Sequence, residues 1–334
     1  MTDNVYKAAE GRYETDMQYN RCAKSGVILP AISLGMWQNF GDTVSLEHSR
    51  EILRKAFDSG ICHIDLANNY GPKYGAAEST FGEIMKSDFR PYRDELFIST
   101  KAGWDMWPGP YGDHGSRKYL MASLDQSLKR MNLDYVDIFY SHRYDPQTPL
   151  EETMQALVDI VRSGKALYAG ISQYPTDVAR QAMEYLEAHD VHCLLHQVKY
   201  NMLERGPETT GQLQQAKENG TGFIAFSALA QGLLTNRYFN GIPADSRAAR
   251  NATLKSDAPT PELIAKLREL DKIAARRGQT LAQMALAWVL KDDLVCSVIV
   301  GASSVQQLEN NIKAAENTHF DAEELAQIDA ILSR

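Results

Sequence analysis

Four polar side chains that could carry acid–base chemistry stand at or just after short apolar runs. Asp65 stands near the end of such a run, Lys101 and His142 come just after two others, and Tyr70 lies in the segment after Asp65. A buried Asp–Lys pair perturbs the pKa of both groups, and a lysine beside a tyrosine is expected to lower the phenol pKa from about 10. Such a tyrosine can donate a proton near neutral pH, and a neutral histidine can hydrogen-bond a carbonyl oxygen. The set predicts protonation of an oxygen atom while a hydride arrives at carbon.

Each of these residues also has an ordinary structural interpretation. A single aspartate after a strand is often a helix N-cap, a single lysine is usually solvated, and a tyrosine before a glycine is often a turn aromatic. A histidine in apolar surroundings is more often a core residue than a catalyst. Four such residues at the same end of successive structural units favour the catalytic interpretation.

A metal-dependent hydrolase is the alternative that uses some of the same residues. Two of the possible ligands are two positions apart on one strand and would point the same way. The full candidate set is His63, Asp65, His142 and His196. Metal sites of this class often contain an HxH pair, which is missing, and this interpretation leaves Lys101 and Tyr70 without a role. We therefore expect no metal site.

Short apolar runs that alternate with helical patterns position these residues. The runs have four to seven residues, as expected for strands buried on both faces. They cover Ile28–Leu34, Ile61–Leu66, Leu96–Thr100, Val136–Tyr140, Ala166–Ser172, Leu194–Tyr200, Gly222–Ser227 and Ser297–Val300. Helices are predicted over Ser45–Ser59, Arg117–Met131, Leu281–Leu290, Val305–Ala315 and Ala322–Leu332. A further helix is expected to have Pro149 at its first position and to end at Gly164.

The alternation of strands and helices predicts the fold class. Units of about 30 residues indicate a parallel sheet, and eight strands fit a (β/α)8 barrel, in which the four polar residues would share one mouth. An open doubly wound sheet is the alternative, but its GxGxxG fingerprint is missing after the first strand. Two long segments, Trp104–Ser116 and Ala228–Pro261, are typical of binding loops. Residues 1–20 are interpreted as a polar arm and residues 21–334 as a single domain.

The composition limits the possible functions. The 334 residues include 35 Lys and Arg against 43 Asp and Glu, a net charge of −8, and 44% are hydrophobic. These values argue against disorder and against sequence-independent nucleic-acid binding. No apolar run approaches the roughly 20 residues of a membrane span, and no signal-peptide pattern is seen, so we expect a cytoplasmic protein without membrane contact. The four cysteines lack CxxC spacing, which argues against a disulfide framework or a common zinc cluster.

Several motifs, taken in order, resemble those of the aldo-keto reductase superfamily. They are GICHIDLANNYG, STKAG, YVDIFYSHR, GISQY and the C-terminal SVIVGASSVQQLENN. The resemblance covers about Met17–Leu332 and implies a (β/α)8 barrel that binds NADPH without a Rossmann fold. It also implies four catalytic residues. Tyr70 would be the general acid, Lys101 would lower the Tyr70 pKa, Asp65 would pair with Lys101, and His142 would orient the carbonyl group.

The resemblance further implies the residues that bind cofactor and substrate. The cofactor positions are Trp37, Asp65, Ser172, Gln173, Gln197, Phe226, Ser227, Leu229, Gln231, Gly232, Arg237, Tyr238, Arg247, Gly301, Ser303, Gln307 and Asn311. The substrate positions, which indicate an aromatic-walled pocket, are Trp37, Tyr70, Trp104 and His142. Two departures concern the adenosine end. Gly301–Asn311 contains no cation for the 2′-phosphate of NADPH, and Asn310 replaces an acidic residue of related proteins.

The implied substrates are small aldehydes, among them L-glyceraldehyde 3-phosphate and methylglyoxal. From charge alone, Arg143 or Arg117 is a candidate for contacting a substrate phosphate. The alternative is a catalytically weak NADPH-binding regulatory subunit that resembles the potassium channel beta subunits of this superfamily. Those proteins carry asparagine at the position of His142, so the histidine favours an active reductase. The same branch forms tetramers or larger assemblies, which implies a homo-oligomer.

Overall fold

Eight parallel strands close into a barrel in the computed structural model, which describes residues 6–244, 246–250 and 253–334. In order around the barrel, the strands are β10 (Ser297–Val300), β3 (Ile32–Gly35), β4 (His63–Asp65), β5 (Phe97–Ala102), β6 (Val136–Ser141), β7 (Ala166–Ser172), β8 (Cys193–Lys199) and β9 (Gly222–Phe226). Strand β10 pairs with both β3 and β9, so the sheet has no free edge. The predicted (β/α)8 barrel is confirmed, and the open sheet is excluded.

One predicted strand is wrong because it is divided between two sheets. The apolar run Ile28–Leu34 contributes its first part to β2 (Ile28–Pro30), which pairs antiparallel with β1 (Tyr19–Arg21), and its second part to β3. Pro30 has no N–H group to donate to a neighbouring barrel strand, so a continuous strand breaks there. The result is a short hairpin that precedes the barrel.

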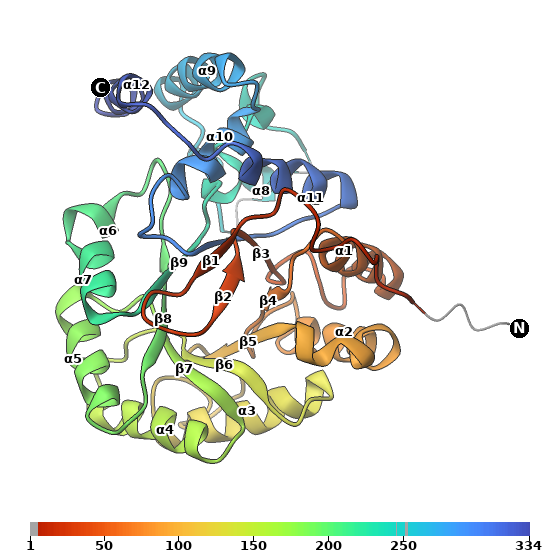
Figure 1. The fold of residues 1–334 in the computed structure, drawn as a ribbon, viewed down its shortest axis with the longest axis vertical. Coiled ribbons are helices and arrows are strands. Elements are labelled where there is room, and N and C mark those ends of the chain that lie inside the picture. The colour runs from red at the N-terminus through yellow and green to blue at the C-terminus, as the bar shows by residue number, and fades with distance from the viewer. Residues whose placement is uncertain (1–5, 245, 251–252) are drawn as a thin grey trace, which may run out of the picture.

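The hairpin closes the end of the barrel at which the strands begin. Leu29 of β2 belongs to the same buried apolar cluster as Ile138 and Leu195 of the barrel interior. Asn20 Nδ2 donates to the backbone carbonyl of Cys296, directly before β10, at 3.1 Å. Figure 1 shows the hairpin (red) crossing the barrel. The carboxyl ends of the strands are thereby left as the open mouth.

Helices surround the barrel (Figure 1). They are α1 (Leu46–Asp58), α2 (Ala76–Ile84), η1 (Met85–Phe89), η2 (Arg90–Glu95), α3 (Arg117–Met131), α4 (Leu150–Arg162), α5 (Thr176–Glu187), α6 (Gly206–Thr209), α7 (Gln212–Asn219), η3 (Ala230–Gly232), η4 (Asn236–Tyr238), α8 (Arg247–Arg250), α9 (Pro261–Arg276), α10 (Leu281–Val289), α11 (Val305–Ile312), η5 (Lys313–Glu316) and α12 (Ala322–Leu332). Within the described ranges, no helix has the length and apolar character needed to cross a membrane.

The helix boundaries follow local sequence signals with two corrections. Ser45, Ser116 and Thr280 are the N-caps of α1, α3 and α10, and the side chain of each accepts a backbone N–H. Pro149 is the N-cap of α4 rather than its first residue, because its ψ of 131° is extended. The expected helix Val305–Ala315 is α-helical only as α11 and tightens into the 3₁₀ turn η5.

The register of the barrel brings the polar residues to its mouth. Asp65 of β4 is in register with Ser99 of β5, and Lys101 follows two residues later on the same side of β5. Ser172 of β7 is in register with Gln197 of β8. Because all strands are parallel, their carboxyl ends meet at the same end of the barrel.

Candidate active site

The ends of β4 and β5 bring Asp65 and Lys101 into a buried ion pair. Lys101 Nζ lies 2.7 Å from Asp65 Oδ2 and also donates to the Leu66 carbonyl at 2.6 Å. The second carboxylate oxygen, Oδ1, accepts from Ser99 Oγ at 2.8 Å and from Gln197 Nε2 at 3.0 Å. Lys101 is 0% exposed and Asp65 is 2% exposed. Both oxygens of the carboxylate therefore have donors, as a buried charge requires.

Tyr70 lies close to this pair, with Lys101 Nζ 4.9 Å from the centroid of its ring. Burial raises the pKa of Tyr70 well above its ordinary value, and the charge of Asp65 raises it further. The net shift of the Tyr70 pKa is therefore upward, opposite to the predicted direction, and a lowering contribution from Lys101 stays a prediction. The ammonium group directs donors to Asp65 and Leu66, and burial lowers the pKa of Lys101 itself. Tyr70 consequently keeps its proton throughout the neutral pH range.

His142 follows β6 and contacts two aromatic rings edge-on. Its ring centroid lies 5.8 Å from that of Tyr70, at an interplanar angle of 71°, and 6.4 Å from that of Trp104, at 90°. Burial lowers the pKa of His142 well below its ordinary value, and the charges of Lys101 and Arg143 lower it further. The imidazole is neutral at pH 7 and can therefore donate a hydrogen bond without carrying a charge.

A chamber of about 930 Å³ opens at these residues. Of the positions predicted for cofactor and substrate, it is lined by Trp37, Asp65, Tyr70, Trp104, His142, Gln173, Gln197, Phe226, Ser227, Leu229, Gln231, Gly232, Arg237, Tyr238, Arg247, Gly301, Ser303, Gln307 and Asn311. In the described part of the chain, Lys101 and Ser172 are not in this lining, and both side chains are buried. The chamber thus extends from the barrel mouth to the loops after β3, β9 and β10.

The chain matches the model of the Aldo/keto reductase family over residues 31–333. The chain belongs to this family. It is 56% identical over 330 residues to the L-glyceraldehyde 3-phosphate reductase of Escherichia coli (strain K12), which covers 97% of this chain and 95% of the relative. It is 35% identical over 304 residues to a probable voltage-gated potassium channel subunit beta of Arabidopsis thaliana, which covers 90% of this chain and 92% of that protein.

Membership of the aldo/keto reductase family fixes the class of reaction. The protein is an NAD(P)-dependent oxidoreductase that acts on carbonyl groups. Buried polar atoms fit a nicotinamide cofactor in the chamber region. Among the described residues, Ser172 Oγ, Gln231 Oε1 and Asn311 Nδ2 are buried without a hydrogen-bond partner. Buried polar atoms normally have partners, so the two that line the chamber, Gln231 Oε1 and Asn311 Nδ2, are available for a polar ligand there, whereas Ser172 Oγ lies outside the lining of the described residues.

The chamber of this aldo/keto reductase also contains residues that the sequence interpretation missed. They include Gln38, Asn39, Asn69, Asn236, Arg250 and Thr280–Ala282. Gln38 and Asn39 directly follow Trp37, and Asn69 directly precedes Tyr70, so adjacency to predicted residues could have found these three. The residues of Thr280–Ala282 cap and begin a helix whose apolar sequence indicates only core, and no sequence signal brings them to the chamber.

Side-chain directions argue against the metal-dependent alternative. The ring nitrogens of His63 lie 2.8 Å from Ser33 Oγ and 3.2 Å from Ser99 Oγ, inside the barrel. His196 points to the outer face of β8, because its neighbour Gln197 reaches into the barrel and successive side chains of a strand alternate. Within the described ranges, no group of three or more His, Cys, Asp or Glu residues could hold a metal ion. The proposed ligands therefore do not converge.

Acidification is expected to destabilise the protein through its buried histidines. Burial lowers the pKa of His63 to about 4 and that of His196 to about 3, whereas an unfolded histidine titrates near about 6.5. Between these values the unfolded chain binds protons that the folded chain does not, so stability falls as the pH falls below about 6.5. Each histidine should lower the free energy of unfolding by about 2 kcal/mol between pH 7 and pH 5.

Urea unfolding at these two pH values measures the effect. A substitution of His196 is a sharper test than a substitution of His63. Its ring packs against Phe223, and neither ring nitrogen has a hydrogen-bond partner among the described residues. His196→Leu should therefore remove about 2 kcal/mol of the pH dependence. The variant His319→Gln, at an exposed position, is the control. An unchanged pH dependence in His196→Leu would contradict the prediction.

The two arginines suggested for a substrate phosphate make other contacts. Arg117 forms an ion pair with Asp159. Arg143 pairs with Asp113 at 2.8 Å and lies over the ring of Trp104. In the described ranges, neither arginine lines the chamber, so their charge does not support a contact with the substrate.

Proposed function

We propose that this protein is an NADPH-dependent reductase of small aldehydes, with L-glyceraldehyde 3-phosphate and methylglyoxal among its substrates. One observation carries the proposal: the proton-bearing Tyr70, the neutral His142 and the buried Lys101–Asp65 pair meet at one chamber. The 56% identical relative, which is named for reduction of L-glyceraldehyde 3-phosphate, supports that substrate. NADPH supplies the hydride when it is bound.

In the proposed reaction, Tyr70 donates its phenolic proton to the carbonyl oxygen of the aldehyde. The neutral imidazole of His142 hydrogen-bonds the same oxygen and orients the carbonyl group. Proton transfer is favourable because the alkoxide formed during reduction is a much stronger base than a phenolate. The raised pKa of Tyr70 keeps the proton in place until that base forms. Lys101, 4.9 Å from the ring centroid, then stabilises the negative charge on Tyr70.

The two ends of the cofactor are assigned to different residues of the chamber region. Ser172 and Gln197 would hydrogen-bond the nicotinamide carboxamide, and the ring of Phe226 offers a flat face for stacking. The adenosine end would contact Ser303, Gln307 and Asn311. The first two of these already contact each other, because the side-chain oxygen of the glutamine accepts from the serine backbone N–H at 2.7 Å and from its hydroxyl at 2.9 Å. The unpartnered Asn311 Nδ2, in a residue that lines the chamber, supports the assignment of the adenosine end.

Arg247 is expected to select NADPH over NADH. Its guanidinium lies 5.9 Å from the ring centroid of Trp37, and burial together with the charges of Arg250 and Arg237 lowers its pKa. All three arginines line the chamber, and such a concentration of positive charge attracts a phosphate. Because Gly301–Asn311 contains no cation, these arginines are the candidates for binding the 2′-phosphate.

Fluorescence titration of both cofactors tests the selection. Arg247→Gln should raise the Kd of NADPH by about 10- to 100-fold and that of NADH by less than about 3-fold. Arg180→Gln, which removes a surface ion pair with Asp177, is the control. An equal loss for the two cofactors would show that Arg247 binds a part that they share, such as the pyrophosphate.

Consumption of NADPH, followed by its absorbance, tests the proposed function with L-glyceraldehyde 3-phosphate, methylglyoxal and a panel of short aldehydes. Turnover with these aldehydes supports the reductase. Tight binding of NADPH without turnover would instead indicate a regulatory subunit like the channel beta proteins. Failure to bind NADPH would overturn the cofactor assignment.

We also propose that the protein works in the cytoplasm as a homo-oligomer, a tetramer or larger, without nucleic-acid, membrane or metal partners. Residues 21–334 would form the catalytic domain and residues 1–20 an arm, of which residues 1–5 lie outside the described ranges and residues 6–20 pack against the domain. Contacts of the arm support this arrangement: Tyr6 Oη donates to Asp58 Oδ1 at 2.7 Å, and Ala8 N donates to Tyr92 Oη at 3.0 Å. Light scattering during gel filtration measures the assembly, and a monomer at micromolar concentration would overturn it.

A further inference from the structure

The loop between β5 and α3 carries an indole ring into the chamber. In this segment, which we call the Trp104 loop (residues 103–116), Trp104 lines the chamber and is 37% exposed. Its ring meets His142 edge-on. The guanidinium carbon of Arg143 lies 4.0 Å from the centroid of the same ring, which is the geometry of a cation–π contact. The indole is therefore held between a proposed catalytic histidine and the arginine that follows it.

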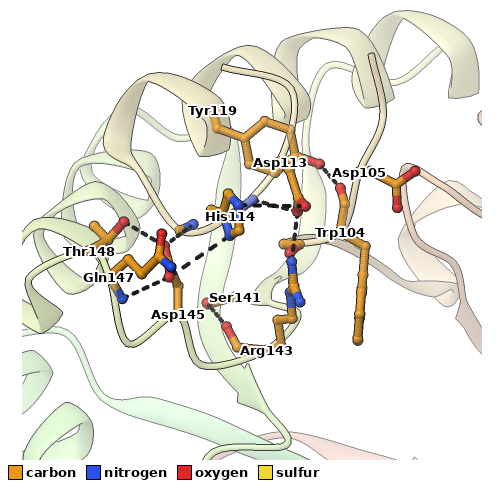
Figure 2. A network of polar contacts seen from close by, with 12 residues as sticks. Trp104, Asp105, Asp113, His114, Tyr119, Ser141, Arg143, Asp145, Gln147 and Thr148 are labelled. Carbon is orange, nitrogen blue, oxygen red and sulfur yellow. Dashed lines mark hydrogen bonds and ion pairs between the residues drawn. The ribbon is translucent and has the colours of Figure 1, made fainter. Parts of the chain in front are cut away.

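Arg143 also binds the backbone and a side chain of the Trp104 loop. Its Nε donates to the Gly103 carbonyl at 2.6 Å, and its Nη2 donates to Asp113 Oδ1 at 2.8 Å. Figure 2 shows the arginine between Trp104 and Asp113. One planar guanidinium thus contacts the loop at three points: the Gly103 carbonyl, the indole ring of Trp104 and the carboxylate of Asp113. A lysine has no planar fork and could not make these contacts together.

Other residues hold the remainder of the loop. The Tyr119 hydroxyl donates to the Trp104 carbonyl and itself accepts from Asn68 Nδ2 at 2.9 Å. Gly115 N donates to Asp145 Oδ2 at 3.1 Å. These contacts hold the backbone on both sides of the loop without using Arg143. Loss of the guanidinium should therefore release the indole ring while the loop stays anchored.

We propose that Arg143 is a positioning residue that fixes Trp104 as a wall of the substrate chamber and so determines which aldehydes are accepted. The inference rests on the proposed reductase function. A fixed indole beside His142 confines a short aldehyde near the group that orients its carbonyl. A released indole confines it less and gives room to a wider aldehyde. Arg143 acts through Trp104, since the guanidinium is outside the chamber lining of the described residues.

The variant Arg143→Lys distinguishes this positioning role from an effect of the positive charge alone. The variant keeps a cation beside His142 and loses the stacking and the fork. We expect the KM values of L-glyceraldehyde 3-phosphate and of unphosphorylated glyceraldehyde to rise by the same factor, about 10-fold, with kcat within about 2-fold. The ratio of kcat/KM for benzaldehyde to that for glyceraldehyde should also rise. Arg117→Lys, the same substitution in the ion pair with Asp159, is the matched control.

A double-mutant cycle with Trp104→Leu tests the path of the effect. In the Trp104→Leu background, Arg143→Lys should leave KM unchanged, because the ring through which it acts is gone. If the KM increases of the two single variants multiplied in the double variant, Arg143 would act independently of Trp104, and the proposal would be overturned. An increase in KM confined to the phosphorylated aldehyde would also overturn it, because Arg143 would then bind the substrate anion directly.

Acrylamide quenching of tryptophan fluorescence gives a readout that needs no turnover. The Trp104 contribution is the difference from Trp104→Leu, measured on the full chain with and without NADP⁺. Arg143→Lys should quench this contribution about twofold more strongly, whereas Arg117→Lys should not change it. If the wild type reduced no aldehyde, the proposed function would fail. Unchanged quenching in Arg143→Lys would overturn the positioning role whether or not the wild type is active.

Discussion

Tyr70→Phe is expected to lower kcat by about 10²- to 10⁴-fold and to bind NADPH as tightly as the wild type. The substitution removes only the hydroxyl that would carry the transferred proton. It keeps the ring that lies 5.8 Å from His142 and 4.9 Å from Lys101 Nζ, so the chamber should keep its shape. Oxidation of NADPH by L-glyceraldehyde 3-phosphate measures the rate, and a fluorescence titration measures cofactor binding.

Tyr140→Phe is the matched control, since it makes the same chemical change in the same barrel. The ring of Tyr140 lies 5.7 Å from Lys101 Nζ, but its hydroxyl is buried and, among the described residues, has no hydrogen-bond partner. Its removal should leave kcat within about 2-fold and should not lower stability. Retained activity in Tyr70→Phe, or an equal loss in both variants, would rule out Tyr70 as the proton donor.

The barrel strands and helices could be predicted because apolar runs and caps are local features of the sequence. Strand β7 and helix α3 have the predicted bounds, Ala166–Ser172 and Arg117–Met131. The hairpin could not be predicted in the same way. Ile28–Leu34 is a mainly apolar run interrupted by Pro30 and Ser33, and its antiparallel partner Tyr19–Arg21 lies in a polar segment without a strand pattern. The position of the hairpin is explained by a tertiary contact, because the hairpin covers the end of the barrel at which the strands begin.

The Asp65–Lys101 pair could be predicted from residue types, because the ends of parallel strands share one mouth. The direction of the Tyr70 pKa shift could not. It depends on how deeply the phenol is buried and on which acceptors take the ammonium donors of Lys101. Sequence places a lysine near a tyrosine without showing that a carboxylate and the Leu66 carbonyl receive its hydrogen bonds.

The backbone conformation of the chamber loops also could not be predicted from the sequence. Gln173, Ser227 and Gln231 all line the chamber with φ values of 55°, 55° and 58°. This left-handed conformation is uncommon outside glycine, asparagine and aspartate, and it occurs where tertiary contacts impose it. One such contact is the hydrogen bond from Gln173 N to the Gln197 carbonyl, at 3.0 Å. The residue types alone do not signal this geometry.

Lys101→Met is expected to lower the free energy of unfolding by about 3–5 kcal/mol, because it leaves a buried carboxylate without its cation. Asp65 is 2% exposed, and its Oδ2 would lose the ammonium partner at 2.7 Å. The same change should lower kcat by about 10²-fold or more, since the charge that stabilises the Tyr70 phenolate is gone. Urea unfolding and the NADPH assay measure the two effects. Lys165→Met, in an exposed pair with Asp125, should cost less than about 1 kcal/mol.

The double variant Asp65→Asn/Lys101→Met separates stability from catalysis. Neutralising both partners removes the unpaired buried charge, and the side-chain oxygen of the introduced amide can still accept from Ser99 and Gln197, as Asp65 Oδ1 does. Its stability should return to within about 1 kcal/mol of the wild type, while kcat stays as low as in Lys101→Met. A Lys101→Met variant as stable as the Lys165→Met control, or a double variant with restored turnover, would refute this. Recovered stability without recovered activity would mean that the barrel keeps this buried pair for its chemistry, against the desolvation cost that burial imposes.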